Sequence, residues 1–69
     1  MGNRIAVQLH DGGSADGRTI EFDFDGEVGS RLCVFVCVAP GVFDQDIYCY
    51  AGDGVARYTR TIESQTQVV

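Results

Sequence analysis

The chain has 69 residues, and ten acidic residues against five arginines give it a formal net charge of −5. A chain of this length forms one small domain with a marginal core, and such domains gain stability from disulfides, a metal or oligomerisation. The acidic balance argues against a nucleic-acid backbone or an anionic membrane as the main partner.

Alternation of apolar and polar side chains predicts two half-buried strands, over residues 4–10 and 18–25. The apolar residues that share one face are Ile5, Val7 and Leu9 in the first strand and Ile20, Phe22 and Phe24 in the second. Between the two strands, residues 11–17 are too rich in glycine to hold regular structure and predict a loop.

The central strand is predicted over residues 32–38, Leu-Cys-Val-Phe-Val-Cys-Val, which are apolar at every position. Its side chains must alternate between two faces, and both faces are apolar. We expect one face to pack on the apolar residues of the first two strands. The other face then needs a cover from the two strands that follow, from the C-terminal tail or from another subunit; the last strand is too poor in apolar residues to cover it well, so we expect a second subunit or a larger particle.

Two further strands complete the expected fold. Residues 39–41, Ala-Pro-Gly, end the central strand, and residues 46–51 and 55–62 form a hairpin around Asp53-Gly54. A two-residue turn there pairs Gly52 with Val55 and Tyr50 with Arg57. The sequence therefore predicts a single all-β domain over residues 1–69, a small antiparallel meander of about five strands curled into an open barrel or sandwich. Residues 63–69 are expected to form an extended C-terminal arm.

The cysteines predict three buried free thiols. Cys33 and Cys37 lie four residues apart on one strand, so their Cα atoms are about 13 Å apart and cannot form a disulfide. A disulfide from Cys49 to one of them is the first alternative. A metal site is the second, although the spacing does not match a zinc knuckle. We expect no metal and no cofactor.

An acidic surface is predicted on the polar side of the second strand and the turn after it, at Glu21, Asp23, Asp25 and Glu27. A solvated face is the simplest interpretation, and the alternatives are a surface for an arginine-rich partner or a calcium loop. The calcium motif is incomplete, because it lacks its terminal bidentate glutamate.

An interface is predicted at Val34, Val36, Tyr48, Tyr50 and Arg57. In the expected hairpin register both tyrosines and Arg57 share one face, and these residue types are frequent at binding hot spots.

No catalytic constellation is present: His10 has no positioned nucleophile, and the glycine-rich loop leads into a strand rather than a phosphate-binding helix. We therefore expect a non-enzymatic structural protein that self-associates or docks on a larger particle, for example a phage capsid decoration or cement protein. The alternative is an acidic inhibitor or mimic that binds a basic site on a partner protein. With no signal peptide or membrane span in the pattern, the expected location is the cytoplasm, or the virion if the protein is phage-encoded.

Overall fold

The computed structural model describes residues 3–63, and all the regular structure in that range is strand. The strands are β1 (Asn3–His10), β2 (Thr19–Phe24), β3 (Arg31–Ala39), β4 (Val42–Gly52) and β5 (Val55–Ile62). The predicted all-β class is confirmed. Of the expected arm, residues 64–69 lie outside the described residues. The described residues contain no helix, and therefore no helix that could cross a membrane.

The five strands form one sheet in the order β2-β1-β5-β4-β3. Three of the four ladders are antiparallel, and β3, β4 and β5 form the expected meander. The ladder between β1 and β5 is parallel, with three pairs from Gln8↔Val55 to His10↔Arg57. Because β2 pairs with one edge of β1, the other edge is free to take β5, which arrives from the far end of the chain.

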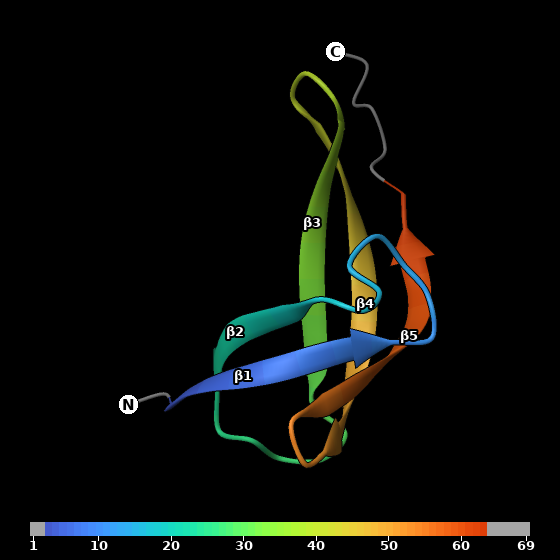
Figure 1. Ribbon diagram of the computed structural model, residues 1–69. Helices are drawn as coiled ribbons and strands as arrows, with labels where there is room; N and C mark the ends of the chain where they lie inside the picture. The colour runs from blue at the N-terminus through green and yellow to red at the C-terminus, as the bar shows by residue number, and fades with distance from the viewer. Residues whose placement is uncertain (1–2, 64–69) are drawn as a thin grey trace.

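The sheet folds over on itself into two layers. In Figure 1 the β1–β2 hairpin lies across β3 and β4, and β5 curves from one layer into the other. The core between them consists of Val7, Leu9, Ala15, Leu32, Tyr48, Tyr50 and Ala56. Half-buried residues at its margin include Ile5, Ile20, Phe22 and Phe24. The apolar sets of the first two strands therefore pack on one face of β3, as predicted.

The face of β3 that packs on the core is the one that the sequence analysis had assigned to a partner. Leu32 is buried and Val34 is half-buried against the core, whereas Cys33 and Phe35 are exposed on the opposite face. The strand is two-faced as expected, but the assignment of the faces was inverted.

A β-bulge between β4 and β5 also separates the tyrosines of β4 from Arg57. Asp53 and Gly54 both have positive φ, 56° and 74°, as the tight hairpin turn requires, and Gly52 pairs with Val55 as predicted. The register then shifts by one residue, so Tyr50 pairs with Ala56 rather than with Arg57. A shift of one residue turns every side chain of a strand to the other face. The tyrosines of β4 and Arg57 therefore lie on opposite faces, and burial shows that both tyrosines point inward and Arg57 outward.

The glycine-rich loop between β1 and β2 is bonded to the inner side of β4. The buried Asp46 carboxylate accepts hydrogen bonds from the Ser14 N–H at 2.7 Å, from the Ser14 hydroxyl at 2.5 Å and from the Thr61 hydroxyl at 2.6 Å. Burial raises the pKa of Asp46, but these hydrogen bonds outweigh it and hold the pKa below its usual value. Asp46 is therefore an ionised anchor for this loop.

Tyr48 holds the same loop from beneath. Its hydroxyl donates to the Gly12 carbonyl at 2.8 Å and accepts from the Ala15 N–H at 3.3 Å. Burial raises the pKa of the Tyr48 phenol above its usual value, and the nearby Asp46 carboxylate adds to the rise. Gly13 lies so close that a Cβ atom there would be 2.3 Å from the Tyr48 hydroxyl oxygen. The loop is thus part of the core structure.

Candidate functional site

The outward side of β3, β4 and β5, which we call the outer face, carries an unusual set of side chains. The ladders place its residues in four rows: Arg31–Cys49–Arg57, Cys33–Ile47–Arg60, Phe35–Gln45–Ile62 and Cys37–Phe43. The first two rows hold the arginines together with Cys33 and Cys49, and the last two rows are mainly apolar and hold Cys37.

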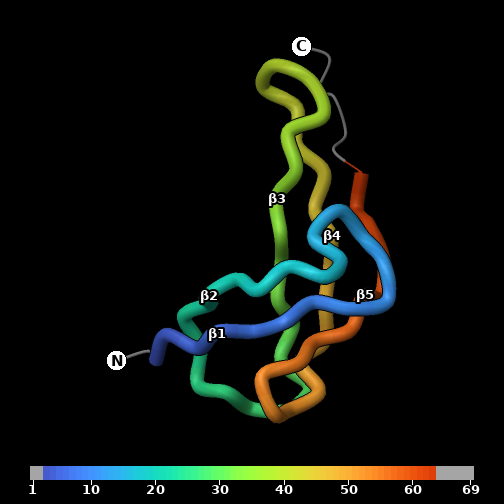
Figure 2. Tube along the Cα trace, in the orientation of Figure 1, coloured from blue at the N-terminus to red at the C-terminus, as the bar shows by residue number. Residues whose placement is uncertain are grey.

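The apolar end continues into a projecting hairpin, residues 35–43, which we call the apolar hairpin. Its sequence, Phe-Val-Cys-Val-Ala-Pro-Gly-Val-Phe, contains no charged residue and no hydrogen-bonding side chain other than one thiol. Figures 1 and 2 show this hairpin extending beyond the body of the molecule. Phe35 is 65% exposed, Val38 54% and Phe43 49%, and Ile62 of β5 is exposed beside them. Such an uncovered patch is typical of an interaction site.

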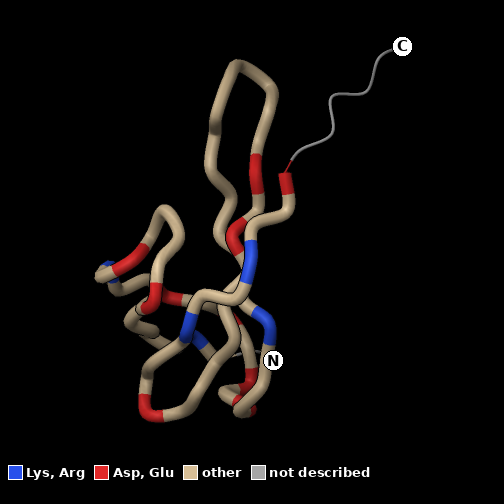
Figure 3. The backbone as a smooth tube through the Cα atoms, turned by 90° about the vertical axis from the view of Figure 1, so that its right-hand side faces the viewer, with Lys and Arg blue, Asp and Glu red and all other residues tan. Residues whose placement is uncertain are grey.

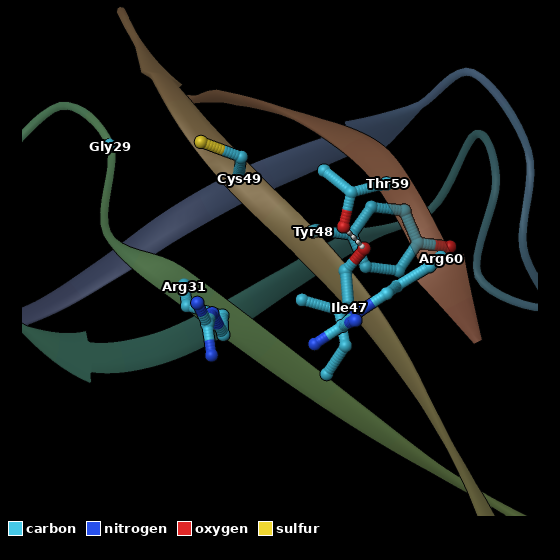
Figure 4. Close-up of a pocket in the computed structure, with 7 residues that line it drawn as sticks. All are labelled: Gly29, Arg31, Ile47, Tyr48, Cys49, Thr59 and Arg60. Atoms are coloured by element: carbon cyan, nitrogen blue, oxygen red, sulfur yellow. Dashed lines mark hydrogen bonds between the residues drawn. The ribbon is translucent and has the colours of Figure 1, made fainter. Parts of the chain in front are cut away.

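The other end of the outer face has a shallow pocket of about 300 Å³, shown in Figure 4. Its lining residues are Gly29, Arg31, Ile47, Tyr48, Cys49, Thr59 and Arg60. Two of the lining side chains, Arg31 and Arg60, are cationic, and Ile47 between their strands is a buried apolar residue. Arg57, in the next row, forms an ion pair with Asp11 at 2.9 Å. A cationic rim over an apolar floor suits a carboxylate-bearing partner.

Of the five predicted interface residues, Arg57 lies on the outer face and the other four face the core. Tyr48 is fully buried and Tyr50 is 7% exposed, and the Tyr50 hydroxyl accepts a hydrogen bond from the Gly54 N–H at 2.9 Å. Val34 and Val36 are half-buried on the core side. Arg57 is exposed on the outer face, but it lies opposite Cys49 rather than beside Tyr50. The two tyrosines therefore pack in the core of the described structure and are not on the outer face; the predicted interface stays a prediction.

The three cysteines are free thiols, but the prediction that all are buried is wrong. Cys33 and Cys37 are exposed and Cys49 is half-buried. The Cys37 thiol donates to the Ala39 carbonyl at 3.2 Å. Within residues 3–63, no three side chains of histidine, cysteine, aspartate or glutamate are grouped so that they could hold a metal ion.

The acidic surface lies where the sequence predicted it. Glu21, Asp23, Asp25 and Glu27 are all exposed on β2 and the turn after it, and Figure 3 marks the charged positions along the chain. Glu21 contacts Arg4 at 3.8 Å, and Asp25 accepts a hydrogen bond from the Glu27 N–H. The acidic and arginine-bearing surfaces belong to different layers of the fold.

The sequence analysis missed the exposure of Phe35 and Phe43. A signal was present, because the apolar run does not stop at the turn but continues through Pro40-Gly41 into Val42-Phe43. A hairpin without polar side chains on either face cannot bury both faces in a domain this small.

Comparison with protein-family models, curated proteins and solved structures found no match for this chain. Function is therefore inferred from the geometry of the outer face.

Proposed function

We propose that the protein is a non-enzymatic structural module that self-associates through the apolar hairpin. The observation that carries this proposal is the exposure of Phe35, Val38 and Phe43 on a hairpin with no charged side chain. Burying a large apolar side chain contributes about 1.5–3 kcal/mol. Folding leaves these three side chains exposed, so their burial has to come from association. A capsid decoration or cement protein is one assembly of this kind.

The test compares two variants at equally exposed positions. Phe35→Asp places a carboxylate in the apolar hairpin, whereas Val28→Asp places it at a 66% exposed valine in the turn between β2 and β3. We expect sedimentation equilibrium to show that wild type and Val28→Asp associate, and that Phe35→Asp weakens association about 100-fold or more, since burying an unpaired charge is costly. Circular dichroism should show all three folded. A wild-type protein that stays monomeric at millimolar concentration would exclude the proposal.

The second candidate is the acidic inhibitor or mimic, favoured by the exposure of Glu21, Asp23, Asp25 and Glu27. Salt separates the two. Binding of a basic partner to this surface weakens as salt rises, whereas association of two copies that each carry −5 is held or strengthened by screening.

A further inference from the structure

β3 is an end strand of the sheet with an unprotected edge. Among the described residues its strand neighbour is β4, and its other edge lies along the open seam of the sheet. Proteins usually guard such edges with charges, proline or short length. Between Leu32 and Ala39, β3 has no charged residue and no proline.

The other end strand, β2, is guarded. It is shorter, and it carries Glu21 and Asp23. Antiparallel pairing of two β2 strands around Phe22 would set Glu21 opposite Asp23 of the partner subunit, and like charges directly opposite are destabilising. The contrast between the two ends singles out the β3 edge for pairing.

We propose that two copies of the chain pair through their β3 edges, antiparallel about a two-fold axis at Phe35. This inference rests on the proposed self-association and specifies its geometry. Phe35 is the midpoint of β3, Arg31–Ala39, and residues 33–37, which this register pairs, lie in the regular part of the strand before the bulge at Val38. It sets the two Phe35 side chains directly opposite each other on the outer face, as an aromatic cross-strand pair.

The same register accounts for the spacing of two exposed thiols. Cys33 and Cys37 are two residues on either side of Phe35, so Cys33 lies opposite Cys37 of the partner subunit, and the reverse. Directly opposite residues of an antiparallel pair have Cα atoms about 4.5–5.5 Å apart, which is within the range that a disulfide spans. Within one chain the two thiols are about 13 Å apart.

The inner face of the paired edge also finds a cover. In Figure 1 the β1–β2 hairpin extends past β3 on the side of the free edge. The two-fold axis brings the apolar hairpin of the partner subunit beneath this overhang, where Phe22 and Phe24 are half-buried. Val34 then lies opposite Val36 of the partner subunit.

Single-thiol variants test the register. One protein keeps Cys33 alone (Cys37→Ser, Cys49→Ser) and the other keeps Cys37 alone (Cys33→Ser, Cys49→Ser). Each is treated with diamide, separately and as an equimolar mixture, above the concentration at which wild type associates. Each disulfide formed transfers two electrons and two protons from two thiols to diamide, which is reduced to the hydrazine.

We expect the mixture to give a crosslinked dimer, reversible by dithiothreitol, at least tenfold faster than either protein alone. Peptide mapping should find Cys33 joined to Cys37. Equal crosslinking in the separate samples, or an associated mixture that does not crosslink faster, would overturn the β3 register while leaving self-association standing. A protein shown to be monomeric by sedimentation would overturn both.

Discussion

Asp46→Asn should destabilise the fold in a way that depends on pH. The wild-type carboxylate accepts three hydrogen bonds while buried, two from Ser14 and one from Thr61. The asparagine side chain keeps one acceptor oxygen. Its NH₂ group replaces the other oxygen and faces a group, of Ser14 or Thr61, that donates to the carboxylate in the wild type. A hydrogen bond to a charged group contributes about 1.5–3 kcal/mol, so we expect a loss of about 2–3 kcal/mol from the free energy of unfolding at pH 7.

The sign of the pH dependence follows from the lowered pKa. An aspartate in the unfolded chain has a pKa of about 3.9, and the pKa of folded Asp46 lies below its usual value. Ionised Asp46 therefore stabilises the fold fully above about pH 5, and this contribution is lost as the pH falls through the folded pKa. The difference between wild type and Asp46→Asn should be constant from pH 7 to pH 5 and should shrink below about pH 4.

Urea unfolding followed by circular dichroism at pH 7, 5 and 3 measures this difference. All samples need one protein concentration, since association stabilises the folded state. Asp23→Asn is the matched control, because Asp23 is an exposed carboxylate on β2, and we expect it to change stability by less than about 0.5 kcal/mol. A loss for Asp46→Asn no larger than that of the control, or one that grows on acidification, would refute the anchor.

Two further substitutions test the packing of the loop. Gly13→Ala would place a Cβ atom 2.3 Å from the Tyr48 hydroxyl oxygen and 2.8 Å from Tyr58 Cδ1, whereas Gly17→Ala, at nearly the same positive φ, meets nothing within 4 Å. We expect Gly13→Ala to lower the free energy of unfolding, measured by urea, by about 1–3 kcal/mol more than Gly17→Ala, because both share the backbone strain; equal losses would contradict the close approach. Tyr48→Phe leaves the Gly12 carbonyl and the Ala15 N–H without their partner and should destabilise by about 1–3 kcal/mol. An unchanged midpoint would show that the hydroxyl does not hold the loop.

Local patterns predicted most of the strands, because alternation and turn chemistry act over a few residues. Val7 and Leu9 alternate with polar neighbours and are buried, and the Asp53-Gly54 turn pairs Gly52 with Val55 as expected. The parallel ladder between β1 and β5 was not predictable in this way. Which edge of β1 receives β5 depends on the path of residues 11–17 and on the whole core.

The candidate site was harder to predict, because it depends on a single extra residue. Ala51 lies in the bulge between two paired positions, and its presence decides whether the tyrosines of β4 share a face with Arg57 or with Ala56. The positive charge of Arg57 would have indicated the bulge. Without it Arg57 would lie directly opposite the inward Tyr50, on the core side, and an isolated guanidinium is poorly accommodated there.

The parallel ladder between β1 and β5 has a consequence for how the chain folds. Of the five described strands β1 comes first along the chain and β5 comes last, so the ladder that joins the two layers forms only once all five strands are present. Closing so long a loop is slow compared with forming the local β3–β4–β5 contacts. The core needs both layers, so we expect it to assemble only after β5 has joined β1. Substitutions that weaken the Leu9↔Ala56 pair should then lower the refolding rate as well as the final stability, if that ladder is formed in the transition state.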